Sequence, residues 1–173
     1  MTKLKDIDFK ILFELMKNSK ISDRELAKIV GVSQPTVSRK RARLEKEVID
    51  EYTAIPKWYK LGYEILAVTL VKSPLKFGSN EERKSAYGRA MEWMAKQPNV
   101  IMGCGCRGMG MTGIMISLHK TYSELDEFLS NHRQELGEIL EDVQTVIVNL
   151  SGKACYRPLH LKYLAETRME ETS

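Results

Sequence analysis

One segment near the N-terminus constrains the fold of this chain most strongly, because it has the pattern of two short helices joined by a tight turn. Ser22 and Glu25 fit a capping box that opens the first of these helices. Gly31 suits the end of that helix, where a left-handed residue is commonly required. Ser33 is a good N-cap for the second helix, and Pro35 fits its first turn. Together these signals predict a helix-turn-helix unit.

The second of the two helices is strongly basic and presents its small and positively charged residues outward. On a wheel of 100° per residue, Val37 and Leu44 face inward. An outward face of short side chains and arginines suits the major groove of double-stranded DNA, where arginine bonds bidentately to guanine. We expect base contacts from Gln34, Pro35, Ser38 and Arg39. We expect backbone contacts from Thr36, Lys40 and Arg43, and Ser33 is a further DNA-binding candidate. For Ser33, capping alone also explains the residue type.

The alternative interpretation of this helix is a solvated basic face, which is what most runs of charge are. The distribution of charge favours DNA binding instead. Residues 1–63 carry 14 Lys and Arg against 9 Asp and Glu, whereas residues 64–173 carry 13 against 14. The basic character therefore belongs to the same third of the chain as the helix-turn-helix, which indicates an anionic partner.

The rest of the chain alternates between strand and helix patterns. Strands are expected over residues 64–71, 100–106, 113–119 and 142–150, and helices over 80–97 and 121–140. The order βαββαβ is that of a ferredoxin-like fold. The fold class is therefore α+β: an N-terminal winged helix-turn-helix, with residues 48–49 and 52–55 as an extended pair forming the wing, followed by a ferredoxin-like βαββαβ ligand-sensing domain.

These patterns divide the chain into four parts. They are a DNA-binding domain, a linker, a ferredoxin-like effector and oligomerisation domain, and a C-terminal tail, over residues 1–55, 56–63, 64–151 and 152–173. The tail has a weak helical pattern, which leaves open whether it packs on a neighbour.

Both faces of the expected sheet are apolar. In the first strand the side chains of Leu66, Val68 and Leu70 point to one face of the sheet, and those of Ile65 and Ala67 point to the other. Two helices can cover only one face of such a sheet. We therefore expect a homodimer formed sheet to sheet.

A sulfur-rich, glycine-rich stretch, residues 102–111, suggests a Cu(I) or zinc site. However, Cys104 and Cys106 lie two residues apart on a strand, which separates their Cα atoms by about 6.6 Å. No second cysteine pair or histidine spacing completes a ligand set, and the three histidines are isolated in the sequence. We expect free thiols in a closely packed strand, with no metal and no cofactor.

The turn that follows is the best candidate for binding a small ligand. Its glycines expose backbone donors, and Arg107 suits a carboxylate. The candidate effector-binding residues are Arg107, Gly108, Met109, Gly110, Met111, Thr112 and Gly113.

Neither a membrane span nor a secretory signal is expected from this sequence. No apolar run approaches the length needed to cross a bilayer, and no apolar segment follows the first lysines. We therefore expect a cytoplasmic protein without membrane partners.

The chain resembles the Lrp/AsnC (feast/famine) family of archaeal and bacterial regulators over residues 4 to about 150. The matching positions are Leu4, Asp8, Ile11, Leu12, Leu15, Ser22, Glu25, Leu26, Ala27, Gly31, Val32, Ser33, Pro35, Thr36, Val37, Ser38, Arg43, Leu44, Glu45, Tyr52, Thr53, Ala54, Leu61, Gly62 and Tyr63. The resemblance implies a DNA-binding transcriptional regulator that forms dimers, which assemble further into tetramers or octamers, and that responds to a small molecule such as an amino acid.

The sequence departs from this family at several positions. Arg41 replaces a usual aliphatic residue, Ala42 replaces a usual basic or polar one, and Glu47 stands where a glycine precedes the wing. The turn at residues 110–113 lacks the family's aspartate, and Asp142 replaces the glycine usual before the last strand. The expected effector chemistry is therefore altered.

Two alternatives belong to other functional classes. The two-domain architecture is similar to that of siroheme decarboxylases, but their His-Asn-Tyr motif is not present and no catalytic arrangement is legible in the sequence. The second alternative is a subunit that does not bind DNA and forms hetero-oligomers with related regulators. Arg41 and the shortened wing keep this alternative open.

Overall fold

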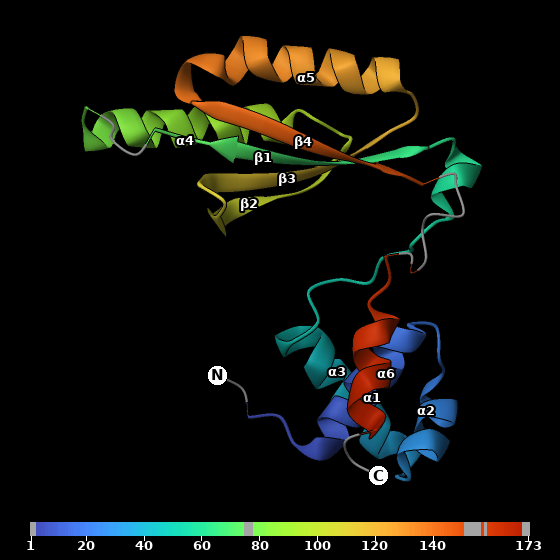
Figure 1. The fold of residues 1–173 in the computed structure, drawn as a ribbon. Coiled ribbons are helices and arrows are strands. Elements are labelled where there is room, and N and C mark those ends of the chain that lie inside the picture. Colours follow the sequence, from blue (N-terminus) through green and yellow to red (C-terminus); the bar gives the residue numbers. More distant parts are fainter. Residues whose placement is uncertain (1–2, 75–77, 151–156, 158, 171–173) are drawn as a thin grey trace. The chain divides into compact units, whose positions relative to one another are not determined.

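The computed structural model describes residues 3–74, 78–150, 157 and 159–170 (Figure 1). The chain divides into two compact units, one formed by Met1–Ile55 with Arg157–Ser173 and the other by Pro56–Tyr156. Within the described residues, no helix is long and apolar enough to cross a bilayer.

The first unit is helical. Its elements are α1 Asp6–Lys17, α2 Asp23–Val30, α3 Gln34–Glu47 and α6 Lys162–Glu170. The first three helices enclose an apolar core in which Ile11, Leu26, Val37 and Leu44 have no exposed surface. On α3, Val37 and Leu44 lie seven residues apart, so both face the core, as the helical wheel predicts. Helices α2 and α3 confirm the pair that the sequence pattern predicts.

Helix α6, in the expected tail, packs on α1 in this same unit (Figure 1). Its Ala165 is fully buried. The tail's weak helical pattern therefore corresponds to a fourth helix of the DNA-binding unit, which the sequence pattern alone left undecided.

The extended pair expected as a wing does not form within residues 48–55, which contain no strand. The N–H groups of Val48 and Ile49 instead donate to the Leu44 carbonyl, at 2.9 and 2.8 Å, and close the end of α3. An isolated two-stranded hairpin is only marginally stable in water. The apolar residues of this segment are therefore not enough to form a wing without a third strand to pair with.

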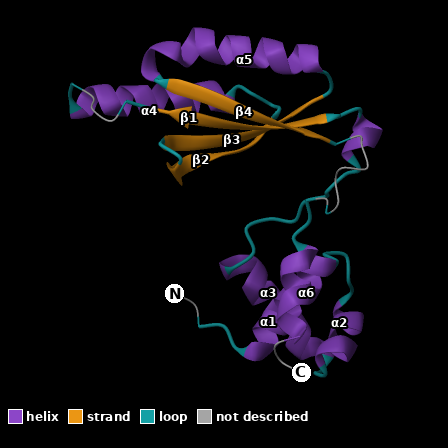
Figure 2. Cartoon of the chain, in the orientation of Figure 1, coloured by secondary structure: helices purple, strands orange, loops and turns teal. Residues whose placement is uncertain are grey.

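The second unit is a four-stranded antiparallel sheet with two helices. Its elements are β1 Ile65–Lys72, α4 Asn80–Ala95, β2 Val100–Gly108, β3 Met111–His119, α5 Tyr122–Leu136 and β4 Asp142–Asn149, with short 3₁₀ turns at Trp58–Leu61 and Gly137–Ile139. The strand order is β2-β3-β1-β4, and both helices lie on the same face of the sheet (Figure 2). This arrangement confirms the ferredoxin-like βαββαβ fold.

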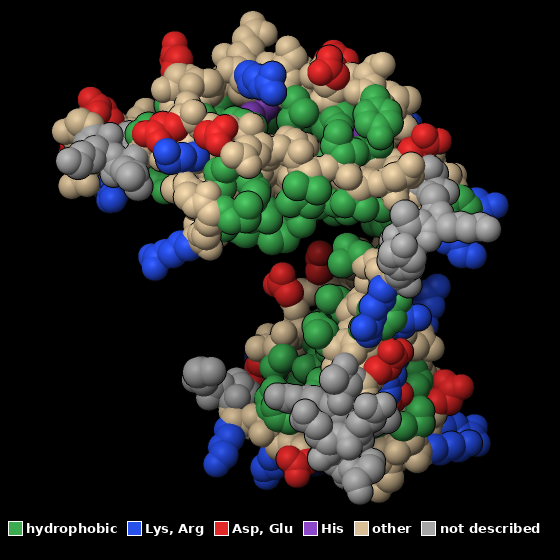
Figure 3. Space-filling model, in the orientation of Figure 1, with side chains coloured by type: hydrophobic (Ala, Val, Ile, Leu, Met, Phe, Trp, Pro, Cys, Tyr) green, Lys and Arg blue, Asp and Glu red, His purple; other side chains and the backbone are tan. Residues whose placement is uncertain are grey.

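The two faces of this sheet differ in what covers them. On the helix face, Ile65, Ala67 and Met115 are buried beneath the core residues of α4 and α5. On the opposite face, Val68 of the central strand pairs with Ile116 on one side and Val146 on the other. Val146 is 58% exposed, and apolar side chains spread across this face (Figure 3). We call it the open sheet face.

Candidate nucleic-acid interface

The turn between α2 and α3 is built as its sequence indicates. The Ser22 hydroxyl and the Glu25 side chain form the capping box of α2. Gly31 has a φ of 77°, in the left-handed region. The Ala27 carbonyl accepts hydrogen bonds from the N–H groups of Gly31 and Val32, at 3.0 and 3.1 Å. This backbone arrangement ends α2 and directs the chain into α3.

The start of α3 differs in one detail from the expected cap. Ser33 occupies the N-cap position with extended backbone, but its side chain makes no capping hydrogen bond. Its hydroxyl lies 2.9 Å from that of Thr36. Pro35 stands in the first turn of the helix, where its missing N–H costs nothing.

The outward face of α3 carries the residues predicted for it. Gln34, Pro35, Arg39 and Ala42 are exposed, as is Ser33 just before the helix. Thr36, Ser38, Lys40 and Arg43 are half-buried. The structure therefore brings all eight predicted DNA-contacting residues to α3 and its cap, but it leaves them unequally accessible.

Two of the predicted cationic contacts are held by a buried carboxylate. Lys40 Nζ donates to Asp8 Oδ1 at 2.7 Å, and Arg43 Nη2 lies 2.7 Å from Asp8 Oδ2 as an ion pair. The Lys5 N–H also donates to Asp8 Oδ2, at 2.9 Å. Burial alone raises the pKa of Asp8, but the interactions with Lys40, Lys5 and Arg43 outweigh that effect and hold the pKa below its usual value.

A second acid, Asp23, ties α2 to α3. Ser38 donates its hydroxyl proton to Asp23. Arg41 Nη1 donates to Asp23 at 3.1 Å and to the Ile21 carbonyl at 3.0 Å, and its Nε donates to Glu45 at 2.9 Å. Arg41, the departure from the family pattern, is thus accommodated inside the unit.

Sequence reasoning missed the roles of Asp8 and Asp23. A signal for Asp8 was present, because Asp8 precedes Ile11 and Leu15 at spacings of three and seven residues. An acid in the apolar stripe of a helix is buried with that stripe and needs a cationic partner. The identity of that partner, on another helix, had no local signal.

The turn predicted to bind an effector is a tight hairpin between β2 and β3. Met109 and Gly110 have φ values of 53° and 74°, the left-handed pair of a two-residue hairpin. Arg107 and Met109 are exposed. By contrast, Met111 is buried, and the Thr112 hydroxyl accepts from the Ser73 N–H at 2.8 Å. The structure thus divides the seven candidate residues into an exposed tip, residues 107–110, and a base in which Met111 is buried and Thr112 and Gly113 are half-buried.

The cysteine strand lies at the edge of the sheet. Cys104 is exposed, Cys106 is half-buried, and both are free thiols. The expected close packing of this strand is wrong for most of its length, because residues 101–105 are exposed. At Gly103 an added Cβ atom would meet only the flexible Met94 side chain. Among the described residues, no group of three or more His, Cys, Asp or Glu side chains is placed to hold a metal ion.

The histidines of the sheet unit are buried. His119 Nε2 lies 2.8 Å from the Ser117 hydroxyl, and His132 meets Trp93 edge to face, with ring centroids 4.9 Å apart. Burial lowers the pKa of both imidazoles from the usual value. Outside this unit, His160 accepts a hydrogen bond from the Lys162 N–H at 3.0 Å.

Comparison with known proteins supports a DNA-binding role for the helix-turn-helix unit. Residues 4–47 match the family model described as winged helix-turn-helix DNA-binding. The chain is 32% identical over 148 residues to the HTH-type transcriptional regulator FL11 of Pyrococcus furiosus, an alignment that covers 84% of this chain and 89% of that protein. It is 38% identical over 88 residues to the leucine-responsive regulatory protein of Rhizobium meliloti, covering 50% of this chain and 55% of the relative.

Solved structures share the fold over nearly the whole chain. The regulator NMB0573 of Neisseria meningitidis, solved as a complex with L-Met, superimposes with a TM-score of 0.75 at 19% identity, covering 94% of this chain and 99% of that one. AsnC of E. coli superimposes with a TM-score of 0.70 at 19% identity, covering 91% and 99%. The helix-turn-helix geometry, the ferredoxin-like unit and these similarities agree: the chain belongs to the Lrp/AsnC family of DNA-binding transcriptional regulators.

Proposed function

We propose that this regulator binds a partly palindromic operator as a homodimer in the cytoplasm, with α3 of each protomer in a major groove. The observation that carries the proposal is the state of the cations on α3. Lys40, Arg41 and Arg43 form ion pairs inside their own unit. Arg39 is exposed, and no described residue forms an ion pair with it. The guanidinium group of Arg39 is therefore free to form hydrogen bonds with the edge of a base in the major groove.

The remaining contacts follow from accessibility and hydrogen-bonding capacity. Gln34 and Pro35 stand at the exposed start of α3, where a recognition helix touches base edges. Ser38 gives its proton to Asp23, so its oxygen is left to accept from a base amino group. Ser33, Thr36, Lys40 and Arg43 are assigned to phosphates. Lys40 and Arg43 reach them from the positions in which Asp8 holds them.

The first test selects genomic DNA fragments with the purified protein and titrates the best fragment against salt. Arg39→Ala is expected to cost about 1–3 kcal/mol of binding free energy and to relax specificity at one position of the site. Arg83→Ala, which removes another exposed arginine, on α4, serves as the matched control and should leave binding unchanged. Equal affinities of Arg39→Ala and the unaltered protein would remove α3 from the interface.

The proposed dimer is formed through the open sheet face. This face presents apolar side chains from three neighbouring strands, including Val68, Ile116 and Val146. A second copy offers the same surface related by a two-fold axis, so that each apolar face covers the other. The two copies of α3 then contact the two half-sites of the operator. Dimers can assemble further into tetramers or octamers.

The proposed effector is an amino acid at the exposed tip of the β2–β3 turn. Arg107 suits a carboxylate, and the structural neighbour NMB0573 was solved with L-Met bound, which supports this ligand class. The protein–DNA complex titrated with individual L-amino acids should change affinity for at least one of them. Arg107→Ala should weaken that response about ten-fold, by the loss of a charge-assisted hydrogen bond. A response unchanged in Arg107→Ala would place the effector elsewhere.

A further inference from the structure

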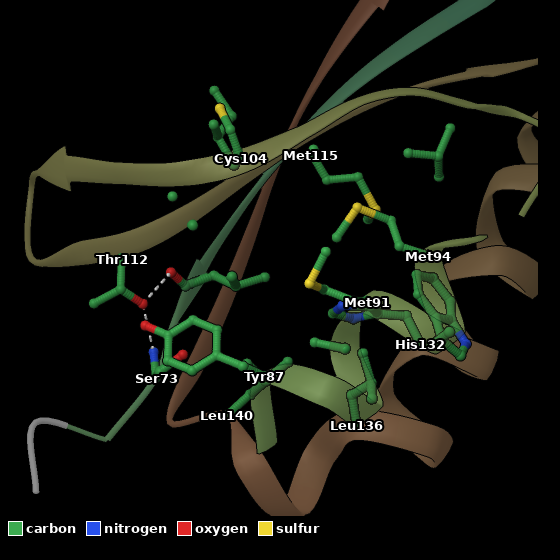
Figure 4. Close-up of a pocket in the computed structure, with 18 of the residues that line it drawn as sticks. Ser73, Tyr87, Met91, Met94, Cys104, Thr112, Met115, His132, Leu136 and Leu140 are labelled. Carbon is green, nitrogen blue, oxygen red and sulfur yellow. Dashed lines mark hydrogen bonds between the residues drawn. The ribbon is translucent and has the colours of Figure 1, made fainter. Parts of the chain in front are cut away.

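A cavity of about 570 Å³ lies between α4 and the strands β2 and β3, on the face of the sheet that the helices cover (Figure 4). Small residues make room for it: Ala86 and Ala90 on α4, and Gly103 and Gly113 on the strands. The volume is in the range of sites that hold drug-sized molecules. The cavity belongs entirely to the sheet unit.

The cavity wall is largely apolar and includes several thioethers, with polar side chains at Ser73, Tyr87, Thr112 and His132. Met91, Met94 and Met115 line it, and none of the described lining residues is Asp, Glu, Lys or Arg. Methionine side chains adapt to ligands of irregular shape. Met91 is 70% exposed, which makes it part of the rim through which a molecule can enter.

One polar atom in this wall lacks a partner. His132 is only 3% exposed, and its Nδ1 atom makes no hydrogen bond within the described part of the chain. Figure 4 shows the side chain of His132 among the other cavity residues. A buried polar atom left without a partner is destabilising, so a ligand that supplies a donor gains by meeting it. Burial also lowers the pKa of His132 and so favours the neutral imidazole, which can accept a hydrogen bond at Nδ1.

We propose that this cavity binds an uncharged, largely apolar small molecule whose single hydroxyl or N–H group donates to His132 Nδ1. The apolar body of the ligand lies against the methionines and Trp93, and its polar group satisfies His132 Nδ1, the buried lining atom without a partner among the described residues. This ligand is distinct from an amino acid at the β2–β3 turn. An ammonium and a carboxylate would each lose their hydration without gaining an ionised partner among the described lining residues, which disfavours binding here.

The volume also separates this proposal from a metal site. Thioethers and an imidazole suit soft ions such as Cu(I). A space of about 570 Å³ is, however, many times larger than the shell of an ion requires, so an organic molecule fits the cavity better.

The test uses N-phenyl-1-naphthylamine, a neutral apolar probe with a single N–H donor. The full-length protein, in a Trp58→Phe background, leaves Trp93 as the fluorescent residue. Because Trp93 lines the cavity, the proposal predicts saturable binding that quenches Trp93 and raises the emission of the probe. Absence of saturable binding would overturn the proposal.

Two variants locate the probe. Ala90→Phe fills the cavity and should weaken binding at least about ten-fold, because a phenyl ring displaces most of the apolar contact with the probe. Gly88→Phe adds the same ring to the same helix at an exposed position with no atom within 4 Å of its Cβ direction, and should bind normally. Unchanged binding in Ala90→Phe would place the probe elsewhere, for example on the open sheet face, and would overturn the proposal.

The role of His132 is tested by comparing the probe with 1-phenylnaphthalene, which has a similar shape and no N–H group. In the unaltered protein the probe should bind about five-fold more tightly, the value of one net hydrogen bond. His132→Phe should abolish that preference while retaining both affinities near that of phenylnaphthalene. A preference that persists in His132→Phe would refute the contact. Since no readout involves DNA or an amino acid, the result is independent of the proposed function.

Discussion

The carboxylate of Asp8 has no exposed surface, yet it lies within 2.7 Å of cationic groups from both Lys40 and Arg43. It therefore does two things at once. It joins α1 to α3 across the core of the DNA-binding unit, and it sets the direction in which two cations of α3 leave the helix. A family match at this position in the sequence identified the residue, but its partners come from the packing of the helices.

Asp8→Asn is expected to lower the free energy of unfolding of this unit by about 1–3 kcal/mol, since the two cations lose their charged partner. Asp6→Asn, at an exposed position of the same helix, should have a much smaller effect. Chemical unfolding followed by far-UV circular dichroism measures both. Equal stability of the two variants would contradict the role assigned to Asp8.

The pH dependence of stability follows from the same carboxylate. Its pKa in the folded protein is lowered, relative to about 3.9 in an unfolded chain. Asp8 therefore contributes stability that is fully present above about pH 4 and is lost as the pH falls through the lower folded-state value. The Asn variant should show a shallower loss of stability than the unaltered protein as the pH falls below about 4.

At the scale of elements, the turn between α2 and α3 depends on one backbone conformation. Gly31 has a φ of 77°, and a Cβ atom added there would meet nothing within 4 Å. Any cost of replacing it therefore comes from the left-handed conformation itself and not from a clash. This separates the backbone requirement of the helix-turn-helix from its packing.

Gly31→Ala should destabilise the DNA-binding unit by about 1–2 kcal/mol, the cost of a left-handed residue with a side chain. Gly88→Ala in α4 supplies the opposite control, because Gly88 is helical and equally uncrowded. It should stabilise the protein by up to about 1 kcal/mol. Thermal unfolding should show a lower melting temperature for Gly31→Ala and a higher one for Gly88→Ala than for the unaltered protein. A stabilised Gly31→Ala protein would mean that the turn tolerates another geometry.

At the scale of the whole molecule, the open sheet face determines how protomers associate. Val146→Lys places a charge at a position that is 58% exposed in the single chain and that the proposed dimer buries. The variant should shift towards monomer in sedimentation equilibrium and lose DNA affinity, because a monomer addresses one half-site.

Ser130→Lys, on the exposed side of α5, introduces the same charge away from the proposed interface and should remain dimeric. If Val146→Lys also remains dimeric, the subunits associate through another surface. The DNA titration then shows whether that other dimer still presents α3 to two half-sites.

The sequence by itself determined the features whose causes lie within a few residues. Caps such as Ser22 and Gly31, and the periodicity of apolar side chains, specify each helix and strand locally, so both the helix-turn-helix and the order βαββαβ were predictable. Only the tertiary structure decided contacts between residues far apart in the chain. Lys40 and Asp8 are separated by 32 positions, and the cavity wall joins α4 to strands on either side of a turn.

The same distinction explains the remaining differences. Helix α6 packs on α1 although nearly the whole chain separates them, and no local pattern could name that partner. The wing had local β propensity at residues 48–55 but no third strand to pair with, so the structure contains no strand there. Local propensity favours a helix or strand, but that element forms only when packing or hydrogen bonding with distant parts of the chain offsets the loss of conformational entropy.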